Sequence, residues 1–304
     1  MEYGEFVTEV KKRLSEKLGG DYEIECKNML KNNSCIYRGI IIKNLTDDNK
    51  VAPAIYMENW YDEFKSGKNI DTIVESIISV YTNCCKMGYE MQLDKLADDF
   101  EPERLFYRLV NFEKNVEMLS DCPFIPFLDL AITFHYLCFD KGTEIHSFRI
   151  TDDIMEKWGI NVEYLIGEAE KNMKRLFPDK LMSLGGMIRD MIESGNSELC
   201  FGEFEYDDVE PNMYVLTNEY GINGAAALLY STKLQQLAAE LDSDIYILPS
   251  SIHEVIMVSA DTIQSTEWLK NLVKEVNFSV VNCEEQLSDN VYLFERNSGN
   301  VSML

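Results

Sequence analysis

The sequence predicts an α+β fold, with mostly antiparallel sheets and amphipathic helices packed on one side of them. Strand-like segments follow one another along the chain through short connectors, which favours antiparallel pairing between sequence neighbours. Between these segments, apolar residues recur at helical spacing, so each helix has one face to bury. We expect an N-terminal α+β subdomain at residues 1–100 and a C-terminal α+β domain at 101–304, unless the two form one continuous unit.

The first hundred residues combine two amphipathic helices with three short strands. The first helix covers residues 6–18, and Gly19-Gly20 ends it because glycine favours non-helical backbone. The second helix lies at 70–84, with Asn69 as its N-cap and a single apolar stripe. Between the two helices, strands are expected at 22–26, 36–42 and 54–57.

The region after the acidic loop at 98–103 is richer in strands. The apolar stretch 126–139 is a predicted strand, and 144–150 is expected to pair with it across Asp140–Thr143. Three helical stretches follow, the best at 162–173 behind an Asn161 cap. The other predicted elements are strands at 105–110, 213–217 and 291–295, an apolar run at 225–230, a helix opened by a capping box at Thr232–Gln235, a hairpin of 245–248 against 255–258 closed by Pro249-Ser250-Ser251, and a helix around 269–276.

The chain carries 53 acidic and 28 basic residues, which gives a net charge of −25. Sequence-independent binding to DNA or RNA needs a basic surface that displaces counterions, so direct nucleic-acid binding is not expected. Docking on an anionic membrane is disfavoured for the same reason, and no apolar run is long enough for a membrane-spanning helix. The acidity favours solubility; alternatively, the carboxylates could mimic the phosphates of a nucleic acid and occupy a basic partner.

Eight cysteines are scattered along the chain without a Cys-x-x-Cys pair or a zinc-ligand spacing. The first residues are acidic and contain no basic segment followed by an apolar one, so a secretory signal is not expected. We therefore interpret all eight cysteines as reduced thiols and the protein as cytoplasmic.

The segment Asp244–Val258 places His253, one of three histidines, just after a Pro-Ser-Ser turn. A serine nucleophile needs a histidine base within hydrogen-bond reach and a carboxylate that orients this base. Ser251 and His253 share a face if the strand extends that far, whereas Glu254 points to the opposite face. Ser251, His253 and Glu254 are therefore candidate catalytic residues, although a structural turn beside a hydrogen-bonded histidine is the favoured interpretation.

Metal and phosphate sites lack their sequence motifs. Met257 stands where a His-Glu-x-x-His zinc helix needs its second histidine. His135 and His146 could approach each other if their strands pair, but neither shows a metal-ligand spacing. Glycine-rich phosphate loops are also missing from the sequence, so we predict no metal and no cofactor.

Polar residues within apolar runs form a second set of candidates, for binding rather than catalysis. These residues are Arg108, Asn111, Asp129 and Asn218. A carboxylate in an apolar strand needs a base or hydrogen-bond donors, and Arg108 is the expected partner of Asp129. Such a pair could form the floor of a polar pocket, but a buried structural ion pair is favoured.

Several segments together resemble a bacterial family with a domain of unknown function that is common in gut anaerobes. The most distinctive is the Leu-Pro-Ser-Ser-Ile-His-Glu-Val-Ile string at 248–256, and the resemblance spans nearly the whole chain. It implies a shared fold but carries no activity, cofactor or catalytic residue. The other matching segments are Pro53–Glu58, Arg108–Asn111 with Glu113–Asn115, Pro126–Leu130, Trp158–Ile160, Met213–Asn218, Gly224–Ala226, Leu287–Asp289 and Val291-Tyr292.

The favoured function is a non-enzymatic cytoplasmic binding or regulatory protein, with an unknown protein as a possible partner. It is favoured because no catalytic group of residues fits the geometry expected from the sequence. One alternative is a hydrolase-like enzyme that uses His253 with Ser251 or a nearby carboxylate. The other is the acidic mimic of a nucleic acid.

Overall fold

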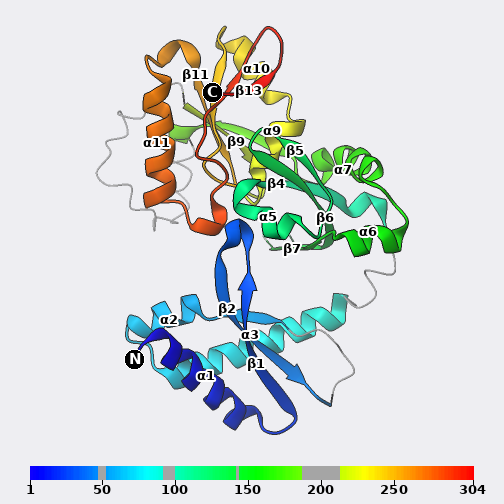
Figure 1. Ribbon diagram of the computed structural model, residues 1–304, viewed down its shortest axis with the longest axis vertical. Helices are drawn as coiled ribbons and strands as arrows, with labels where there is room; N and C mark the ends of the chain where they lie inside the picture. The colour runs from blue at the N-terminus through cyan, green and yellow to red at the C-terminus, as the bar shows by residue number, and fades with distance from the viewer. Residues whose placement is uncertain (47–52, 92–99, 142–143, 187–212) are drawn as a thin grey trace. The chain divides into compact units, whose positions relative to one another are not determined.

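The computed structural model describes residues 1–46, 53–91, 100–141, 144–186 and 213–304 of the chain (Figure 1). The chain divides into two compact units, Met1–Phe100 and Glu101–Leu304, and each is described by itself. Both units combine helices with antiparallel sheets, so the predicted α+β class is confirmed.

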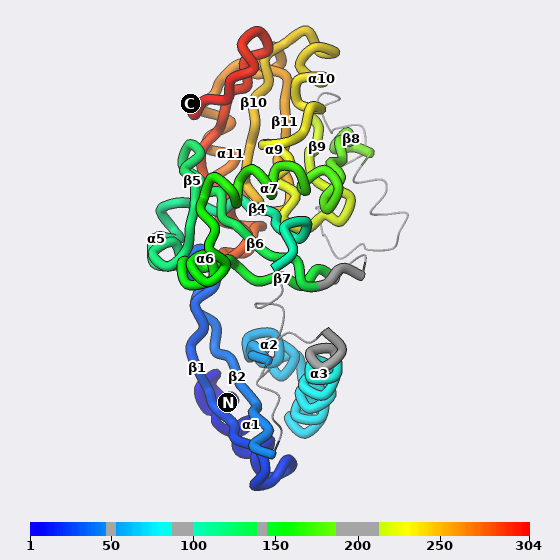
Figure 2. The backbone as a smooth tube through the Cα atoms, turned by 90° about the vertical axis from the view of Figure 1, so that its right-hand side faces the viewer, coloured from blue at the N-terminus to red at the C-terminus, as the bar shows by residue number. Residues whose placement is uncertain are grey.

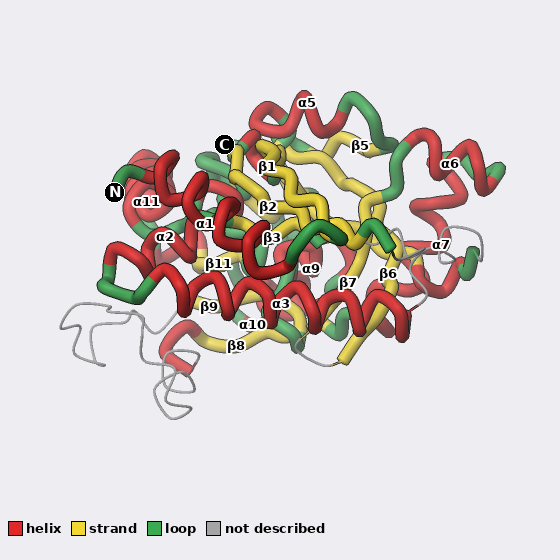
Figure 3. The backbone as a smooth tube through the Cα atoms, turned by 90° about the horizontal axis from the view of Figure 1, so that it is seen from below, coloured by secondary structure: helices red, strands yellow, loops and turns green. Residues whose placement is uncertain are grey.

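The first unit is a three-stranded antiparallel sheet, β1-β2-β3, with helices packed against it. Apolar residues of α1, such as Phe6 and Val10, share one core with Ile40 and Ile42 of β2 and Ile77 of α3. Figure 3 shows α1 and α3 running beside each other next to the strands. The elements are α1 (Tyr3–Leu18), β1 (Tyr22–Leu30), β2 (Ile36–Asn44), β3 (Ala54–Tyr56), α2 (Glu58–Lys65), which the sequence did not predict, and α3 (Ile70–Met91).

The second unit contains two antiparallel sheets. In the first sheet, the strand order is β4-β6-β5, and β7 pairs with the far part of β6. Helix α7 packs against β4 and lies over it in Figure 2. The elements of this part are β4 (Leu105–Asn111), α5 (Val116–Leu119), β5 (Phe124–Phe127), β6 (Leu130–Lys141), β7 (Glu144–Arg149), α6 (Asp152–Trp158) and α7 (Val162–Leu176).

The single strand predicted at 126–139 is wrong, because the chain reverses at Leu128-Asp129. This two-residue turn pairs Phe127 with Leu130 and separates β5 from β6. Leu128 adopts a backbone φ of +55°, which leucine rarely does. Because such turn positions are usually recognised by glycine or asparagine, the sequence did not indicate a reversal here. The expected pairing of the next strand is confirmed, since β6 and β7 pair from His135 opposite Arg149 onward.

The second sheet has the order β13-β12-β10-β11-β9-β8 over the described strands. It contains the predicted hairpin, in which Ile247 of β10 lies opposite Met257 of β11. Helix α11 packs against this hairpin through Leu269 and Val273. The elements are β8 (Asp179–Ser183), β9 (Met213–Asn218), η5 (Gly224–Ala226), α9 (Ala227–Tyr230), α10 (Lys233–Glu240), β10 (Ile245–Leu248), β11 (Val255–Ser259), α11 (Thr266–Ser279), β12 (Tyr292–Phe294) and β13 (Val301–Met303).

The capping box predicted at Thr232 is also wrong. Thr232 has a helical backbone and its side chain accepts no cap hydrogen bond, whereas an N-cap residue needs extended backbone. The hydroxyl of Ser231 accepts the Lys233 N–H instead, at 3.0 Å, and donates to Asp179. The start of α10 is therefore held by a residue one position earlier than the sequence pattern indicated.

The cysteines only partly follow the expectation of eight reduced thiols. Five of those that the structure describes are free: Cys26, Cys84, Cys85, Cys122 and Cys138. Cys35 and Cys283 are instead disulfide-bonded, so the expectation is wrong for these two. Cys200 lies outside the described residues.

Candidate functional site

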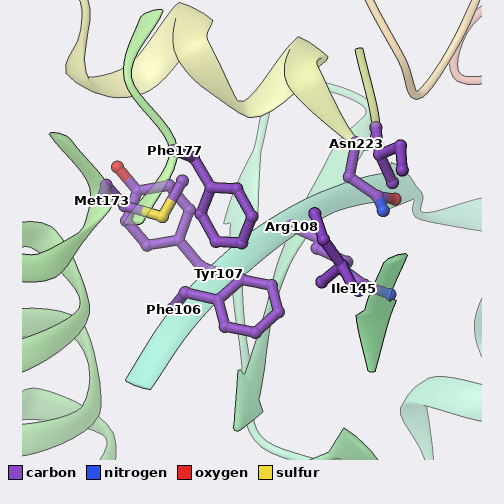
Figure 4. A pocket seen from close by; sticks show the side chains of 8 residues that line it. Phe106, Tyr107, Arg108, Ile145, Met173, Phe177 and Asn223 are labelled. Carbon is purple, nitrogen blue, oxygen red and sulfur yellow. The ribbon is translucent and has the colours of Figure 1, made fainter. Parts of the chain in front are cut away.

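A small pocket in the second unit brings together residues from four separate segments. Arg108 and its neighbours on β4 meet Ile145 of β7, the end of α7 and the segment 222–223. The pocket holds about 220 Å³ of empty space, part of it open to solvent. Figure 4 shows Phe106 and Phe177 on one side and Arg108, Ile145 and Asn223 on the other. The lining residues are Phe106, Tyr107, Arg108, Ile145, Met173, Phe177, Ile222 and Asn223.

Strand β4 positions Arg108 in this pocket. It is surrounded by protein except for a small exposed part, and burial lowers the pKa of Arg108 to about 10. The guanidinium therefore stays charged at pH 7. Its Nη2 donates to the Ser147 hydroxyl at 2.8 Å, its Cζ lies 5.2 Å from the centre of the Phe106 ring, and its Nε is buried without an acceptor.

The expected ion pair between Arg108 and Asp129 is wrong. Arg108 lies opposite Thr133 in the β4–β6 register, which leaves Asp129 roughly 13 Å away along the strand at about 3.3 Å per residue. Asp129 accepts hydrogen bonds from the Tyr292 hydroxyl at 2.5 Å, from Ser288 at 2.6 Å and from the Asn290 amide at 2.9 Å. The carboxylate is thus satisfied by neutral donors, and Arg108 forms no ion pair among the described residues.

His135 lies on β6 beside this guanidinium. It is opposite Phe106 on one side and Arg149 on the other, and its ring is 5.5 Å from the Phe106 ring. Burial, together with the charges of Arg108 and Arg149, holds the pKa of His135 well below its usual value. His146 pairs with Phe139, four residues further along β6, so the register keeps it away from His135.

The segment after β9 forms one wall of the pocket, and Asn218 holds it in place. The Asn218 amide donates to the Ile222 carbonyl at 2.9 Å and its oxygen accepts the Tyr220 N–H at 3.0 Å. Asn223 follows with a left-handed backbone, φ +52°, which redirects the chain. The predicted binding candidate Asn218 therefore positions the pocket wall without lining it.

Gly224 joins this wall to the His253 segment. A Cβ at Gly224 would lie 2.1 Å from the Thr217 hydroxyl and 2.4 Å from the His253 carbonyl, so only glycine fits. The Thr217 hydroxyl donates to that carbonyl at 2.7 Å, and the backbone N–H of Asn223 donates to His253 Nδ1 at 3.3 Å. His253 therefore supports a residue that lines the pocket.

The three catalytic candidates lie in the connection between β10 and β11, which runs from 249 to 254 rather than through a three-residue turn. The Ser251 hydroxyl accepts the His253 backbone N–H at 3.0 Å. Glu254 does not follow the strand alternation that the sequence suggested, because β11 starts only at Val255. Burial raises the pKa of Glu254, opposed by the nearby His253 and by a hydrogen bond from Ser251.

This geometry gives each candidate a local partner. His253 Nδ1 accepts from backbone, so the neutral ring carries its proton on Nε2, which lies 3.6 Å from a Glu285 oxygen. The Ser251 hydroxyl is buried and forms a hydrogen bond with Glu254. The arrangement is a hydrogen-bonded turn in which the serine hydroxyl bonds the His253 backbone N–H and Glu254 rather than the imidazole ring.

Asn111, the remaining binding candidate, contacts a distant segment. Its amide donates to the Leu287 carbonyl at 2.9 Å, and its oxygen accepts the Lys114 N–H at 2.8 Å. The next residue of that segment, Ser288, is held by Asn277, which donates to its carbonyl at 2.9 Å. Asn111 and Asp129 thus anchor the chain just before β12, away from the residues that line the pocket.

A family model matches residues 3–296 of the chain, and its description is a family of unknown function, DUF5688. The chain belongs to the DUF5688 family. No curated protein and no solved structure shows a significant match.

Several of the segments that carried the resemblance contact one another within the second unit of this DUF5688 chain. Thr217 and Gly224 bind or pack against the His253 carbonyl, and Asp129 binds the segment that follows Leu287. In the described parts of the chain, no helix is long and apolar enough to cross a membrane.

Most of the pocket wall escaped sequence reasoning. Met173 lies on the apolar side of α7, Phe177 directly follows the end of this helix, and Ile145 belongs to a strand, so each has the pattern of an ordinary core residue. Arg108 was found because a charged residue interrupts an apolar strand. For Asn223 the sequence offered only a weaker indication of a special role, namely its position in the turn between Gly221 and Gly224.

Proposed function

We propose that this DUF5688 chain is a non-enzymatic binding protein of the bacterial cytoplasm and that the pocket beside Arg108 holds its small-molecule ligand. The observation that carries the proposal is the pocket itself, a preformed recess with apolar walls and a few polar groups. Such recesses are the usual sites of small-ligand binding. The five free thiols fit a reducing compartment, whereas the disulfide-bonded Cys35 and Cys283 count against it.

The rigid support of the wall also favours binding. Asn218, Gly224 and His253 fix the segment that contributes Ile222 and Asn223. A site whose lining residues are already fixed loses less conformational entropy when a ligand enters. The recess is shallow and partly open to solvent, so its ligand is compact and lies partly outside the enclosed space.

A hydrolase that uses His253 is less well supported by the same contacts. A nucleophilic serine needs its hydroxyl directed at a base, and Ser251 instead accepts a backbone N–H and bonds Glu254. His253 is better explained as a support for Asn223.

A thermal-shift screen of the full chain against compact carboxylic acids, amides, alcohols, sugars and nucleosides tests the proposal. A ligand that binds only the folded state raises the melting temperature. Ile222→Trp fills the pocket from its partly exposed wall, and Ile263→Trp is the matched control on the surface packed by α11. We expect at least one compound to stabilise the wild type and Ile263→Trp but not Ile222→Trp. The proposal fails if no compound shifts the melting temperature, or if Ile222→Trp responds like the wild type.

A further inference from the structure

The Arg108 guanidinium has more hydrogen-bond donors than the described chain satisfies. An arginine side chain carries five N–H donors, and the one acceptor that Arg108 contacts is the neutral Ser147 hydroxyl. Its Nε lies buried without an acceptor. None of the ion pairs in the described structure includes Arg108, although the protein has a net charge of −25.

A largely buried charge without a counter-charge is unfavourable, since most of its hydration is lost and here only the Ser147 hydroxyl and the Phe106 ring replace it. Other arginines of the second unit show the ordinary solution: Arg104 pairs with Glu101 at 2.8 Å and Arg149 with Asp121 at 3.1 Å. Arg108 is thus an exception in a chain rich in carboxylates. The pocket next to it is where a missing partner can enter.

We infer that the ligand of this pocket is a compact monocarboxylate whose carboxylate pairs with the Arg108 guanidinium and whose apolar part lies against Phe106, Phe177 and Ile145. This inference rests on the proposed function, which it narrows to one chemical class. The guanidinium fork matches a carboxylate with two parallel hydrogen bonds.

The remaining lining residues select this class over other anions. Arg108 is the one charged residue among those that line the pocket, and most of the others are apolar or aromatic. A phosphate group carries up to two negative charges, and the single guanidinium among the lining residues neutralises only one of them. The negative field of the whole chain also disfavours multiply charged ligands.

Titration calorimetry of the full chain with pairs of compounds tests the inference. Each pair consists of a linear or aromatic monocarboxylic acid of two to eight carbons and its primary amide, which has the same shape without the charge. We expect at least one acid to bind the wild type and its amide to bind at least tenfold more weakly.

Three variants assign the effect to Arg108. Arg108→Met removes the charge and is expected to weaken binding of the acid at least 100-fold, whereas Arg108→Lys keeps the charge without the fork and loses about tenfold. Arg104→Met, at an arginine that already has a carboxylate partner, should bind like the wild type. Since Arg108→Met removes an unpaired buried charge, its urea midpoint should equal or exceed that of the wild type.

The outcomes separate this inference from the proposed function. Suppose that neutral compounds bind the wild type as tightly as acids do, and that they do not bind Ile222→Trp. This result contradicts the inference of a carboxylate ligand but still supports the proposed binding site. Acids that bind Arg108→Met as tightly as the wild type also overturn it. If no acid binds, the carboxylate inference fails; the proposed function fails with it only if no compound of the wider thermal-shift screen binds either.

Discussion

At the scale of single residues, the second unit encloses positive charge inside an acidic protein. Arg108, His135 and Arg149 lie on three strands of one sheet: His135 on β6 is directly opposite Arg149 of β7, and Arg108 of β4 is two residues from Phe106, the partner of His135 on its other side. A protonated imidazole there would face two guanidinium groups without solvent. The neutral ring is instead accommodated by Phe106 and by Thr133, whose hydroxyl lies 3.1 Å from Nε2.

His135 makes the stability of the second unit depend on pH. Burial and the two arginines hold the pKa of His135 well below its usual value near 6.5, so the unfolded chain binds a proton that the folded chain does not. Stability is therefore fully present above pH 6.5 and falls as the pH decreases below it, by up to about 1.4 kcal/mol per pH unit from this group. His135→Phe keeps a ring and removes the titration. In urea unfolding, its stability should decline less steeply than that of the wild type between pH 6.5 and 5.

The control for this experiment is His146→Phe, at an exposed position of the neighbouring strand. It should follow the pH dependence of the wild type. Parallel curves for the wild type and His135→Phe would show that His135 titrates normally and would contradict the prediction.

At the scale of elements, the sequence predicts those segments whose periodicity decides the structure locally. The helices α1, α3, α7 and α11 follow apolar stripes and cap residues, and the β10–β11 hairpin follows two apolar runs around a turn. The errors arise where distant contacts override local pattern. The chain reverses at Leu128 next to Asp129, which binds Tyr292 far along the sequence. The spacing of residues also could not show that Arg108 bonds a serine hydroxyl rather than a carboxylate.

The candidate site divides along the same line. Arg108 and Asn218, which holds the pocket wall, could be selected from the sequence. A polar residue within an apolar strand is costly to bury unless it has a structural or functional role. The aromatic wall could not, since Phe177 and Phe106 lie about 70 residues apart and meet only through the packing of α7 on β4. A pocket wall and a core have the same composition, and only the fold separates them.

The junction between β9 and η5 is sensitive to a single methyl group. Gly224→Ala places its Cβ against the Thr217 hydroxyl, the His253 carbonyl and the Asn218 nitrogen, at 2.1, 2.4 and 2.8 Å. We expect a loss of about 3 kcal/mol in urea unfolding, as for severe overpacking in a core. Gly167→Ala, in the interior of α7 with nothing within 4 Å of its Cβ, should instead gain up to about 1 kcal/mol from helix propensity. Equal effects of the two substitutions would disprove the close approach at Gly224.

At the scale of the whole molecule, each of the two units has a buried core of its own. The first is built from α1, the three-stranded sheet and α3, and the second contains the cluster between α11 and the β10–β11 hairpin. Cores without shared residues allow separate unfolding equilibria, so a change in one should leave the other intact.

Hydrogen exchange measured by mass spectrometry can follow both units in one sample. Ile77→Ala removes a fully buried side chain of the first core and should cost about 2–5 kcal/mol there. We expect faster exchange in peptides from residues 1–86 and unchanged exchange in those from 101–304. Val273→Ala, in the second unit, should give the opposite pattern. Faster exchange throughout the chain in either variant would mean that the units unfold as one.

The turn at Leu128-Asp129 has a consequence for the order of events during synthesis on the ribosome. Its unusual backbone is secured by Asp129, whose partners Ser288, Asn290 and Tyr292 lie about 160 residues later in the sequence. The β5–β6 hairpin therefore leaves the exit tunnel long before the side chains that hold its turn have been translated. Until they arrive, Asp129 is a solvated carboxylate on an unanchored reversal, and the second unit completes its structure only after nearly all of its chain has emerged.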